Sequence, residues 1–291
     1  MSNKREKMRK SVKTFLANNR WLKKVPTTLT ICNSLCGYVA ILYTLHVYSE
    51  DVSNPARVLE ISAWVILFAM VFDALDGFTA RIFNAASLHG LQMDSLSDMV
   101  TFGLAPMVIV AIMAHKFREL KTSDFYIVWG LCSVYIGCAA NRLANYNIHA
   151  MLQKRKAEKF RGLPSPGAAA GICSLVIYYS ISTKELKQIV NILPVYAGIL
   201  GFLMISEIRY VHVGKWLQTA RRSKIKLLVL ASIILCLIFK PAITIVIAIN
   251  IYILSGPFNE FILRKKEENT ENEPENEIDT EIKQISGVEK I

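Results

Sequence analysis

The sequence predicts an all-α integral membrane protein, a polytopic helix bundle of about eight spans. Three observations indicate this class. First, 53% of the 291 residues are hydrophobic, and the mean hydropathy of +0.34 is high for a soluble domain. Second, the apolar residues gather in long runs, several of which reach the ~20 residues that a helix needs to cross a bilayer. Third, basic residues concentrate between these runs and before the first of them.

The apolar runs place the candidate spans in order along the chain. They are expected at residues 27–48, 59–83, 91–114, 125–146, 167–182, 189–211, 227–239 and 242–262. The fifth and the seventh are short for a span. The last two meet at Lys240 and Pro241, which form a tight reversal. We therefore expect a six-helix core followed by a C-terminal hairpin, which either spans the membrane or lies in it as a reentrant or interfacial element.

Composition divides the chain into four segments. They are a basic cytoplasmic arm (1–24), a membrane core (25–211), a basic loop with the C-terminal transmembrane hairpin (212–264) and a disordered acidic tail (265–291). The arm holds nine Lys and Arg, and we expect it to contact anionic lipid head groups. Residues 267–291 of the tail hold nine acidic residues and two lysines, a composition typical of disorder. Reversible docking of the tail onto the basic loops is the alternative.

Loop charges predict how the protein is oriented in the membrane. With eight spans and the N-terminus inside, 23 Lys and Arg fall in cytoplasmic segments and seven fall on the other side. Cytoplasmic loops carry an excess of Lys and Arg, so this arrangement is favoured. We therefore expect a protein of the cell (inner) membrane, whose N-terminus, C-terminus and second-to-third loop face the cytoplasm.

Four aspartates lie at membrane depth within 26 residues: Asp73, Asp76, Asp94 and Asp98. Each costs at least about 2.5 to 3.5 kcal/mol on insertion scales, so a compensating interaction is expected. The pairs are spaced by three and by four residues, so each pair lies on one face of a helix. Converging carboxylates repel one another unless a divalent cation lies between them, and Mg²⁺, Mn²⁺ and Ca²⁺ prefer oxygen ligands. The sequence therefore predicts a metal site.

The residues between the two aspartate pairs indicate a substrate as well as a metal. Gly77 and Ala80 are small and leave room for a ligand or a second backbone. Arg81 lies four residues after Gly77, where its guanidinium could hold a phosphate group. Carboxylates, a metal ion and an arginine together favour phosphoryl chemistry.

These residues resemble a known signature, D-x2-D-G-x2-A-R-x8-G-x3-D-x3-D, which is that of the CDP-alcohol phosphotransferase family. The resemblance implies an integral membrane enzyme, a homodimer, that moves a phosphoalcohol or phosphatidyl group from a CDP-linked donor to an alcohol and releases CMP. It also implies that the four aspartates hold one or two Mg²⁺ or Mn²⁺ ions and that Asp98 is the catalytic base. Gly77, Ala80 and Arg81 would form the bed for the cytidine phosphate.

Four stretches are similar to the phosphatidylserine synthase branch of that family. Residues 25–30, leading to Asn33 and Gly37, resemble its opening helix. Residues 98–106 resemble its D-x-V-S-F-G-x-A-P segment, with Thr101 in place of Ser. Residues 160–166 resemble its F-x-G-L-P-S-P loop, and residues 206–210 its S-x-I-R-Y segment. Asn145 stands where that branch usually has an arginine. The resemblance implies CDP-diacylglycerol as the donor, diacyl or an ether analogue, and L-serine as the acceptor.

Three arginines are candidates for binding the serine carboxylate or the lipid phosphate: Arg142, Arg161 and Arg209. Each lies at the cytoplasmic end of an expected span. The guanidinium fork suits carboxylate and phosphate groups. The alternative interpretation is that these arginines only mark the cytoplasmic interface.

Other functions remain open at this point. A different acceptor, such as glycerol 3-phosphate, inositol phosphate or choline, would preserve the same signature. A cation transporter also uses carboxylates inside the membrane, but it would not need Gly, Ala and Arg at these spacings. The six cysteines lie in apolar spans without a CxxC pair, so neither zinc nor disulfides are expected. No P-loop is present, and no nucleic-acid partner is expected.

Overall fold

A computed structural model describes residues 22–49, 52–83, 85, 87–117, 122–151, 162–180, 189–210 and 224–261. Nearly all of these residues are helical, which confirms the predicted all-α class. In this part of the chain five helical stretches are long and apolar enough to cross a membrane, and two shorter apolar helices accompany them. The predicted polytopic bundle is thereby confirmed. Most of the basic arm and the whole acidic tail lie outside the described residues.

The first three helices of the core begin where local sequence signals place them. α2 (Val25–Leu45) carries Pro26 in its first turn, where a missing backbone N–H costs nothing. α3 (Pro55–Ile82) is capped by the Asn54 side chain, which accepts the Arg57 N–H at 3.3 Å. α4 (Leu88–Asp98) is capped by Ser87, whose hydroxyl accepts the Gly90 N–H at 3.0 Å.

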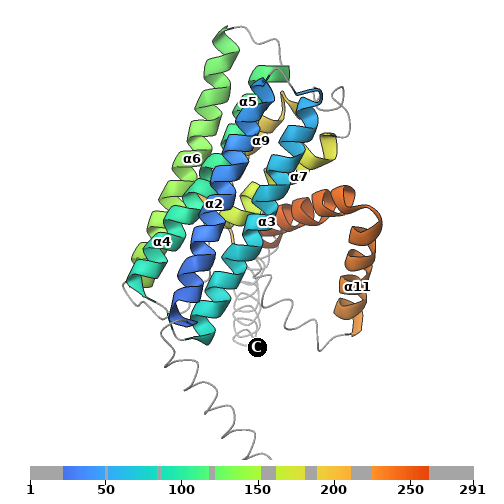
Figure 1. The fold of residues 1–291 in the computed structure, drawn as a ribbon. Helices are drawn as coiled ribbons and strands as arrows, with labels where there is room; N and C mark the ends of the chain where they lie inside the picture. Colours follow the sequence, from blue (N-terminus) through green and yellow to red (C-terminus); the bar gives the residue numbers. More distant parts are fainter. Residues whose placement is uncertain are drawn as a thin grey trace, which may run out of the picture.

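The remaining elements complete the chain order. They are the short 3₁₀ turns η1 (Leu22–Lys24) and η2 (His46–Tyr48), the π-helical turn η3 (Met99–Leu104), α5 (Ala105–Phe117), α6 (Thr122–Met151), α7 (Ser165–Tyr179), α9 (Leu193–Ile205), α11 (Lys224–Phe239) and the helix Pro241–Phe261. All eight expected spans correspond to helices at these positions. The sequence predicts a tight reversal at Lys240, but the helix Pro241–Phe261 turns there across the bundle instead of running back along α11 (Figure 1).

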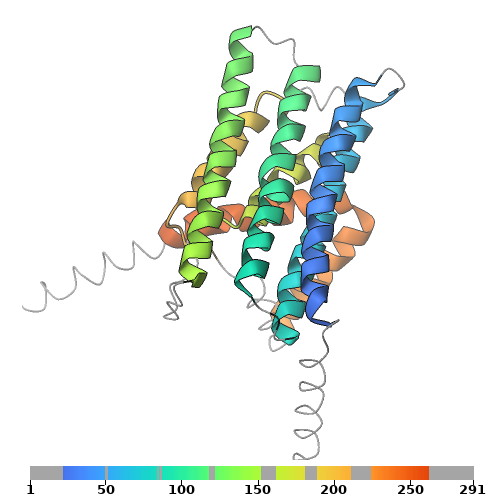
Figure 2. The same cartoon turned by 60° about the vertical axis from the view of Figure 1, so that its left-hand side comes forward.

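The helices α2, α3, α4 to α5 and α6 run alongside one another, as Figures 1 and 2 show. α2 packs most extensively on α3, α6 packs on α9, and α3 packs on α7. The continuous stretch Leu88–Phe117 is 61% buried in its most apolar window, whereas the other long helices are buried by a third or less. This stretch, which carries two of the aspartates, is therefore the centre of the bundle.

The last helix, Pro241–Phe261, crosses the bundle rather than running along it (Figures 1 and 2). We call it the crossing helix. α11 precedes it and forms the first half of the predicted C-terminal hairpin. Length and composition alone would allow the crossing helix to span a bilayer. That α11 and the crossing helix both span the membrane stays a prediction.

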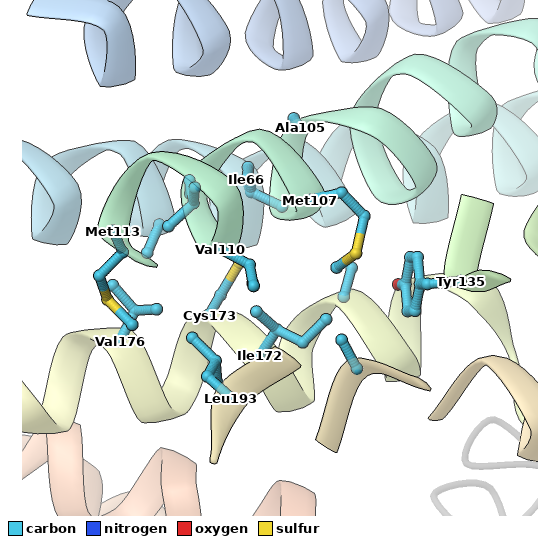
Figure 3. Packing of buried hydrophobic residues seen from close by; sticks show 14 of the residues in the cluster. Ile66, Ala105, Met107, Val110, Met113, Tyr135, Ile172, Cys173, Val176 and Leu193 are labelled. Carbon is cyan, nitrogen blue, oxygen red and sulfur yellow. The ribbon is translucent and has the colours of Figure 1, made fainter. Parts of the chain in front are cut away.

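The hydrophobic core lies mainly between α5 and α7 (Figure 3). Met107, Val110 and Met113 of α5 face Ile172 and Val176 of α7, and all five are buried. Side chains from α3, α6 and α9 close the cluster. Large apolar side chains on the outer faces of the helices are exposed, as expected where lipid replaces water. The six cysteines are all free, in agreement with the prediction that the chain has no disulfides.

We predict that Gly162→Ala destabilises the protein by about 1 to 3 kcal/mol. Gly162 has φ of 81°, and an added Cβ would lie 2.3 Å from the Met204 carbonyl oxygen. Its N–H also donates to the Ile208 carbonyl at 2.8 Å, so the backbone cannot easily move away. Thermal unfolding in detergent measures the effect. Gly137→Ala in α6 is the matched control, because an added Cβ there meets nothing within 4 Å. Equal unfolding temperatures for the two variants would contradict this prediction.

Candidate active site

The four aspartates come together from two neighbouring helices at one end of the bundle. Asp73 and Asp76 lie in the C-terminal part of α3, and Asp94 and Asp98 lie on α4. One carboxylate oxygen from each of Asp73, Asp76 and Asp94 lies within 4.8 Å of the other two. The two pairs recognised by their spacing in the sequence thus converge in space.

Asp98 lies beside this cluster. Its carboxyl group is close enough to those of Asp73, Asp76 and Asp94 for their negative charges to repel one another. A hydrogen bond comes from α2, where the amide Nδ2 of Asn33 donates to Asp98 Oδ1 at 3.3 Å. Only 9% of the Asp98 surface is exposed. Asp76, which is 5% exposed, and Asp98 are therefore the two buried members of the cluster.

A polar stripe on α2 supports the carboxylates. The Thr30 hydroxyl donates to Asp76 Oδ2 at 2.9 Å, and Asn33 contacts Asp98 as described. Two side chains from the α4–η3 segment also bond to the backbone of α2. The Ser97 hydroxyl donates to the Thr30 carbonyl and the Thr101 hydroxyl donates to the Asn33 carbonyl, each at 2.9 Å. Polar contacts of this kind join helices inside a membrane. They fix α2 against the aspartate-bearing helix.

Close approach of these two helices depends on a glycine one turn further along α2. An added Cβ on Gly37 would lie 2.6 Å from the Thr101 hydroxyl oxygen and 2.8 Å from its Cα. Small residues at helix crossings allow such approach. In the sequence, Thr30, Asn33 and Gly37 belong to the stretch that resembles the opening helix of the serine branch, but no contact with the aspartates was predicted for them.

The donor set fits a divalent cation. Asp94 Oδ1 and Asn33 Oδ1 are buried and have no hydrogen-bond partner within the described part of the chain. Buried oxygens without a partner are costly, and clustered carboxylates add mutual repulsion. Hard oxygen ligands are those that Mg²⁺ and Mn²⁺ prefer. Asp73, Asp76 and Asp94 are the residues that could hold such an ion, and Asp98 lies beside them.

A π-helical turn, η3, follows directly after Asp98. Such turns interrupt the regular pattern of an α-helix and are frequent at functional sites. Here the turn links α4 to α5 without a loop, and the Tyr135 hydroxyl of α6 donates to the Phe102 carbonyl within it at 3.0 Å. Thr101 and Phe102 are both fully buried, so packing holds the inner side of the turn. It sets the direction of the aspartate-bearing helix.

The residues expected to bind the cytidine phosphate lie on an open part of α3. Gly77 and Arg81 are exposed, Ala80 is half-buried, and an added Cβ on Gly77 would meet nothing within 4 Å. Arg81 Nε donates to the Gly77 carbonyl of its own helix at 2.9 Å. The four-residue spacing places Asp73, Gly77 and Arg81 along one face of α3. The structure therefore keeps these residues beside the carboxylate cluster.

Arg142, on α6, lies near the same site. One of its terminal nitrogens donates to the Ser165 hydroxyl at 2.6 Å, and the charge of Asp98 acts on its guanidinium. Its Nε is buried without a hydrogen-bond partner among the described residues. Arg209 is half-buried, and the carbonyl of the preceding residue Ile208 accepts the Gly162 N–H. Arg161 itself lies outside the described residues.

An all-helical membrane bundle with a buried cluster of carboxylates fits a membrane enzyme that uses a divalent metal, and it also fits a cation transporter. Comparison with known proteins favours the enzyme. The CDP-alcohol phosphatidyltransferase family model matches residues 23–200, which include all four aspartates. The chain therefore belongs to the CDP-alcohol phosphatidyltransferase family, and it is an integral membrane enzyme. The family resemblance predicted from the signature is confirmed.

Several curated relatives share most of this region. A CDP-diacylglycerol–serine O-phosphatidyltransferase of Helicobacter pylori is 28% identical over 205 residues, which cover 67% of this chain and 77% of the relative. The protein of the same name from Bacillus subtilis is 30% identical over 196 residues, which cover 66% of this chain and 92% of the relative. An archaetidylserine synthase of Methanothermobacter thermautotrophicus is 31% identical over 209 residues, covering 70% and 73%.

We predict that Asn33→Leu lowers kcat for CMP release at least about tenfold, as loss of a residue that orients a metal ligand usually does. Leucine keeps the volume of the side chain but removes the amide that donates to Asp98. The control is Thr44→Val on the same helix, because the Thr44 hydroxyl bonds only within α2, to the Ala40 carbonyl. Steady-state kinetics at saturating metal and donor measure the effect. If both variants retain equal kcat, the Asn33 contact has no catalytic importance.

Proposed function

We propose that this protein transfers the phosphatidyl group from CDP-diacylglycerol to the hydroxyl group of L-serine, giving phosphatidylserine and CMP. The observation that carries the proposal is the convergence of Asp73, Asp76 and Asp94 within 4.8 Å inside the region that matches the family. The names of the relatives support serine as the acceptor. The segments at residues 98–106 and 206–210 support it as well.

The four aspartates are the proposed ligands of one or two Mg²⁺ or Mn²⁺ ions. When bound, such ions neutralise the charge that develops on the pyrophosphate as its bridging bond breaks. The support for this assignment is the all-oxygen donor set with its unpartnered Asp94 Oδ1. Thr30 and Asn33 orient two of the ligands through their hydrogen bonds to Asp76 and Asp98.

Asp98 is the proposed general base. It takes the proton from the serine hydroxyl, and the serine oxygen forms a new bond to the phosphorus of the phosphatidyl group. The bond from that phosphorus to the oxygen of CMP breaks, and CMP leaves with the electron pair. Asn33 occupies Asp98 Oδ1, so Oδ2 is the oxygen assigned to the acceptor proton. The enclosure of Asp98 limits access of water, which would otherwise compete with serine.

The remaining site residues are proposed to bind the two substrates. Gly77 and Ala80 leave space for the cytidine phosphate, and Arg81 binds it. Arg142, Arg161 and Arg209 bind the serine carboxylate or the lipid phosphate, because the guanidinium fork matches both groups. Arg142 is the best placed of the three, since the charge of Asp98 acts on its guanidinium.

The proposed setting is the cell (inner) membrane, with both termini and the active site on the cytoplasmic side. The excess of Lys and Arg on that side, 23 against seven, supports the orientation. We also propose a homodimer and four segments: the basic arm, the core at 25–211, the hairpin segment at 212–264 and the acidic tail. Anionic lipid head groups are the proposed contact of the arm.

An acceptor panel tests this function. The purified protein is given CDP-diacylglycerol and Mn²⁺, with L-serine, glycerol 3-phosphate, inositol phosphate, choline or no acceptor, and CMP is measured. We expect release that depends on serine. Release that depends on another acceptor would refute serine and keep the family chemistry. No release with any acceptor, although Mn²⁺ binds, would favour a cation transporter. A parallel series with an ether-linked donor identifies the lipid class.

A further inference from the structure

The crossing helix lies beyond residues 23–200, the part of the chain that matches the family. One side of this helix nevertheless packs closely on the core. Ile253 is only 3% exposed, and an added Cβ on Gly171 of α7 would lie 2.8 Å from its Cδ1. The Tyr196 hydroxyl of α9 donates to Asn250 Oδ1 at 2.9 Å. A hydroxyl-to-amide hydrogen bond in an apolar setting fixes how the two helices dock.

The same side of the crossing helix reaches the first turn of α7. The Tyr252 ring lies 3.4 Å from the position of an added Cβ on Gly167. Tyr252 also packs beside Tyr210, with ring centroids 5.7 Å apart, and the Tyr210 hydroxyl donates to the Ile253 carbonyl at 3.2 Å. Gly256 allows this arrangement, because an added Cβ there would lie 2.4 Å from the Tyr210 ring. The helix thus holds the segment after α9 and the start of α7 together.

The first turn of α7 is also where Arg142 is held. Ser165 accepts the hydrogen bond from the Arg142 guanidinium, two residues before Gly167. Asp98 and Tyr252 both lie near enough to act electrostatically on the Arg142 guanidinium. The first turn of α7 links Arg142 to the crossing helix, because it carries both Ser165 and Gly167.

We propose that the crossing helix forms one wall of the acceptor subsite and that Tyr252 is a positioning residue, which holds the first turn of α7 and thereby the Arg142 guanidinium. The ligand of this subsite is the carboxylate of a small amino acid. The inference rests on the proposed function, because it assigns Arg142 to the acceptor. It adds that acceptor binding depends on a helix outside the part of the chain that matches the family.

Kinetics of Tyr252 variants test the proposal. We expect Tyr252→Ala to raise the KM for serine about tenfold while the KM for CDP-diacylglycerol stays within about twofold. Tyr252→Phe keeps the ring against Gly167 and is expected to restore the KM for serine. Leu254→Ala on the outer face of the same helix is the control, because Leu254 is 67% exposed. The proposal is overturned if Tyr252→Ala behaves like Leu254→Ala, or if both Michaelis constants change together.

A second variant tests whether the crossing helix borders the acceptor subsite, without removing the Tyr252 side chain. Gly256→Ala places a methyl group against the Tyr210 ring and displaces the crossing helix from the core. We expect the same selective rise in the KM for serine. An unchanged KM for serine in Gly256→Ala, if Tyr252→Ala does not fold, would overturn the proposal.

The wild-type protein separates failure of this inference from failure of the proposed function. If wild-type CMP release requires serine and neither variant changes the KM for serine, the proposed role of the crossing helix is refuted and the proposed function is retained. If wild-type CMP release requires another acceptor, the assignment of serine as the acceptor is refuted. The KM of the variants for that other acceptor then tests the role of the crossing helix.

Discussion

Asp98→Asn is expected to lower kcat for serine-dependent CMP release by about 10²- to 10⁴-fold, the usual contribution of a general base. Asparagine keeps the size of the side chain but cannot accept the acceptor proton as a carboxylate does. The variant is expected to fold, because removing one charge from a crowded carboxylate cluster relieves repulsion. Rates at saturating Mn²⁺, donor and serine, together with the unfolding temperature, measure both effects.

The control for this experiment is Asp124→Asn. Asp124 lies in the first turn of α6, at the end of the bundle away from the aspartate cluster (Figure 1). We expect its kcat to stay within about twofold of the wild-type value, as for most substitutions away from a site. A kcat for Asp98→Asn that matches the control would show that another group takes the proton.

Asp76→Asn is expected to weaken Mn²⁺ binding at least about tenfold, because it removes a charged oxygen ligand from the cluster. Without metal, the variant is expected to unfold at the same temperature as the wild type or higher, since it carries less mutual repulsion. Addition of Mn²⁺ is expected to reverse this order, because an ion that binds only the folded state stabilises it. Direct binding of Mn²⁺ and thermal unfolding with and without the ion measure the effect.

Thr30→Val separates loss of a ligand from loss of its support. It keeps the Asp76 carboxylate and removes the hydroxyl that donates to it. We expect a smaller loss of Mn²⁺ affinity than in Asp76→Asn. Equal Mn²⁺ affinity in Asp76→Asn and the wild type would contradict the assignment of this carboxylate as a ligand.

Hydrophobic runs predicted the helices well because each run had to be about as long as a bilayer is thick. They could not predict that the crossing helix lies across the bundle, since hydropathy contains no information on tilt, which packing against neighbours decides. The contacts of Tyr196 with Asn250 and of Tyr210 with Ile253 fix that direction. They join residues more than 40 positions apart, so no local pattern indicates them.

The carboxylates were predictable because charge is rare and costly at membrane depth, and because their spacing placed each pair on one helix face. The residues that support the carboxylates were harder to predict from the sequence. Asn33 is one polar residue in an apolar span, and its contact with Asp98 exists only because Gly37 lets the helices approach. The signature identified Arg81, whereas Arg142 was one of three arginines that could equally mark only the cytoplasmic interface. The structure adds that Arg81 is exposed while Arg142 is half-buried and bound to Ser165.

The most direct test of the proposed reaction follows the oxygen atom of serine. The purified protein is incubated with CDP-diacylglycerol, Mn²⁺ and L-serine that carries a heavy oxygen isotope in its hydroxyl group. The mass of the lipid product is then measured by mass spectrometry. Direct attack of the serine hydroxyl on phosphorus predicts phosphatidylserine that retains the heavy oxygen, with one CMP released per lipid formed. Phosphatidylserine without the label, or release of CMP with phosphatidic acid as the only lipid product, would contradict the account.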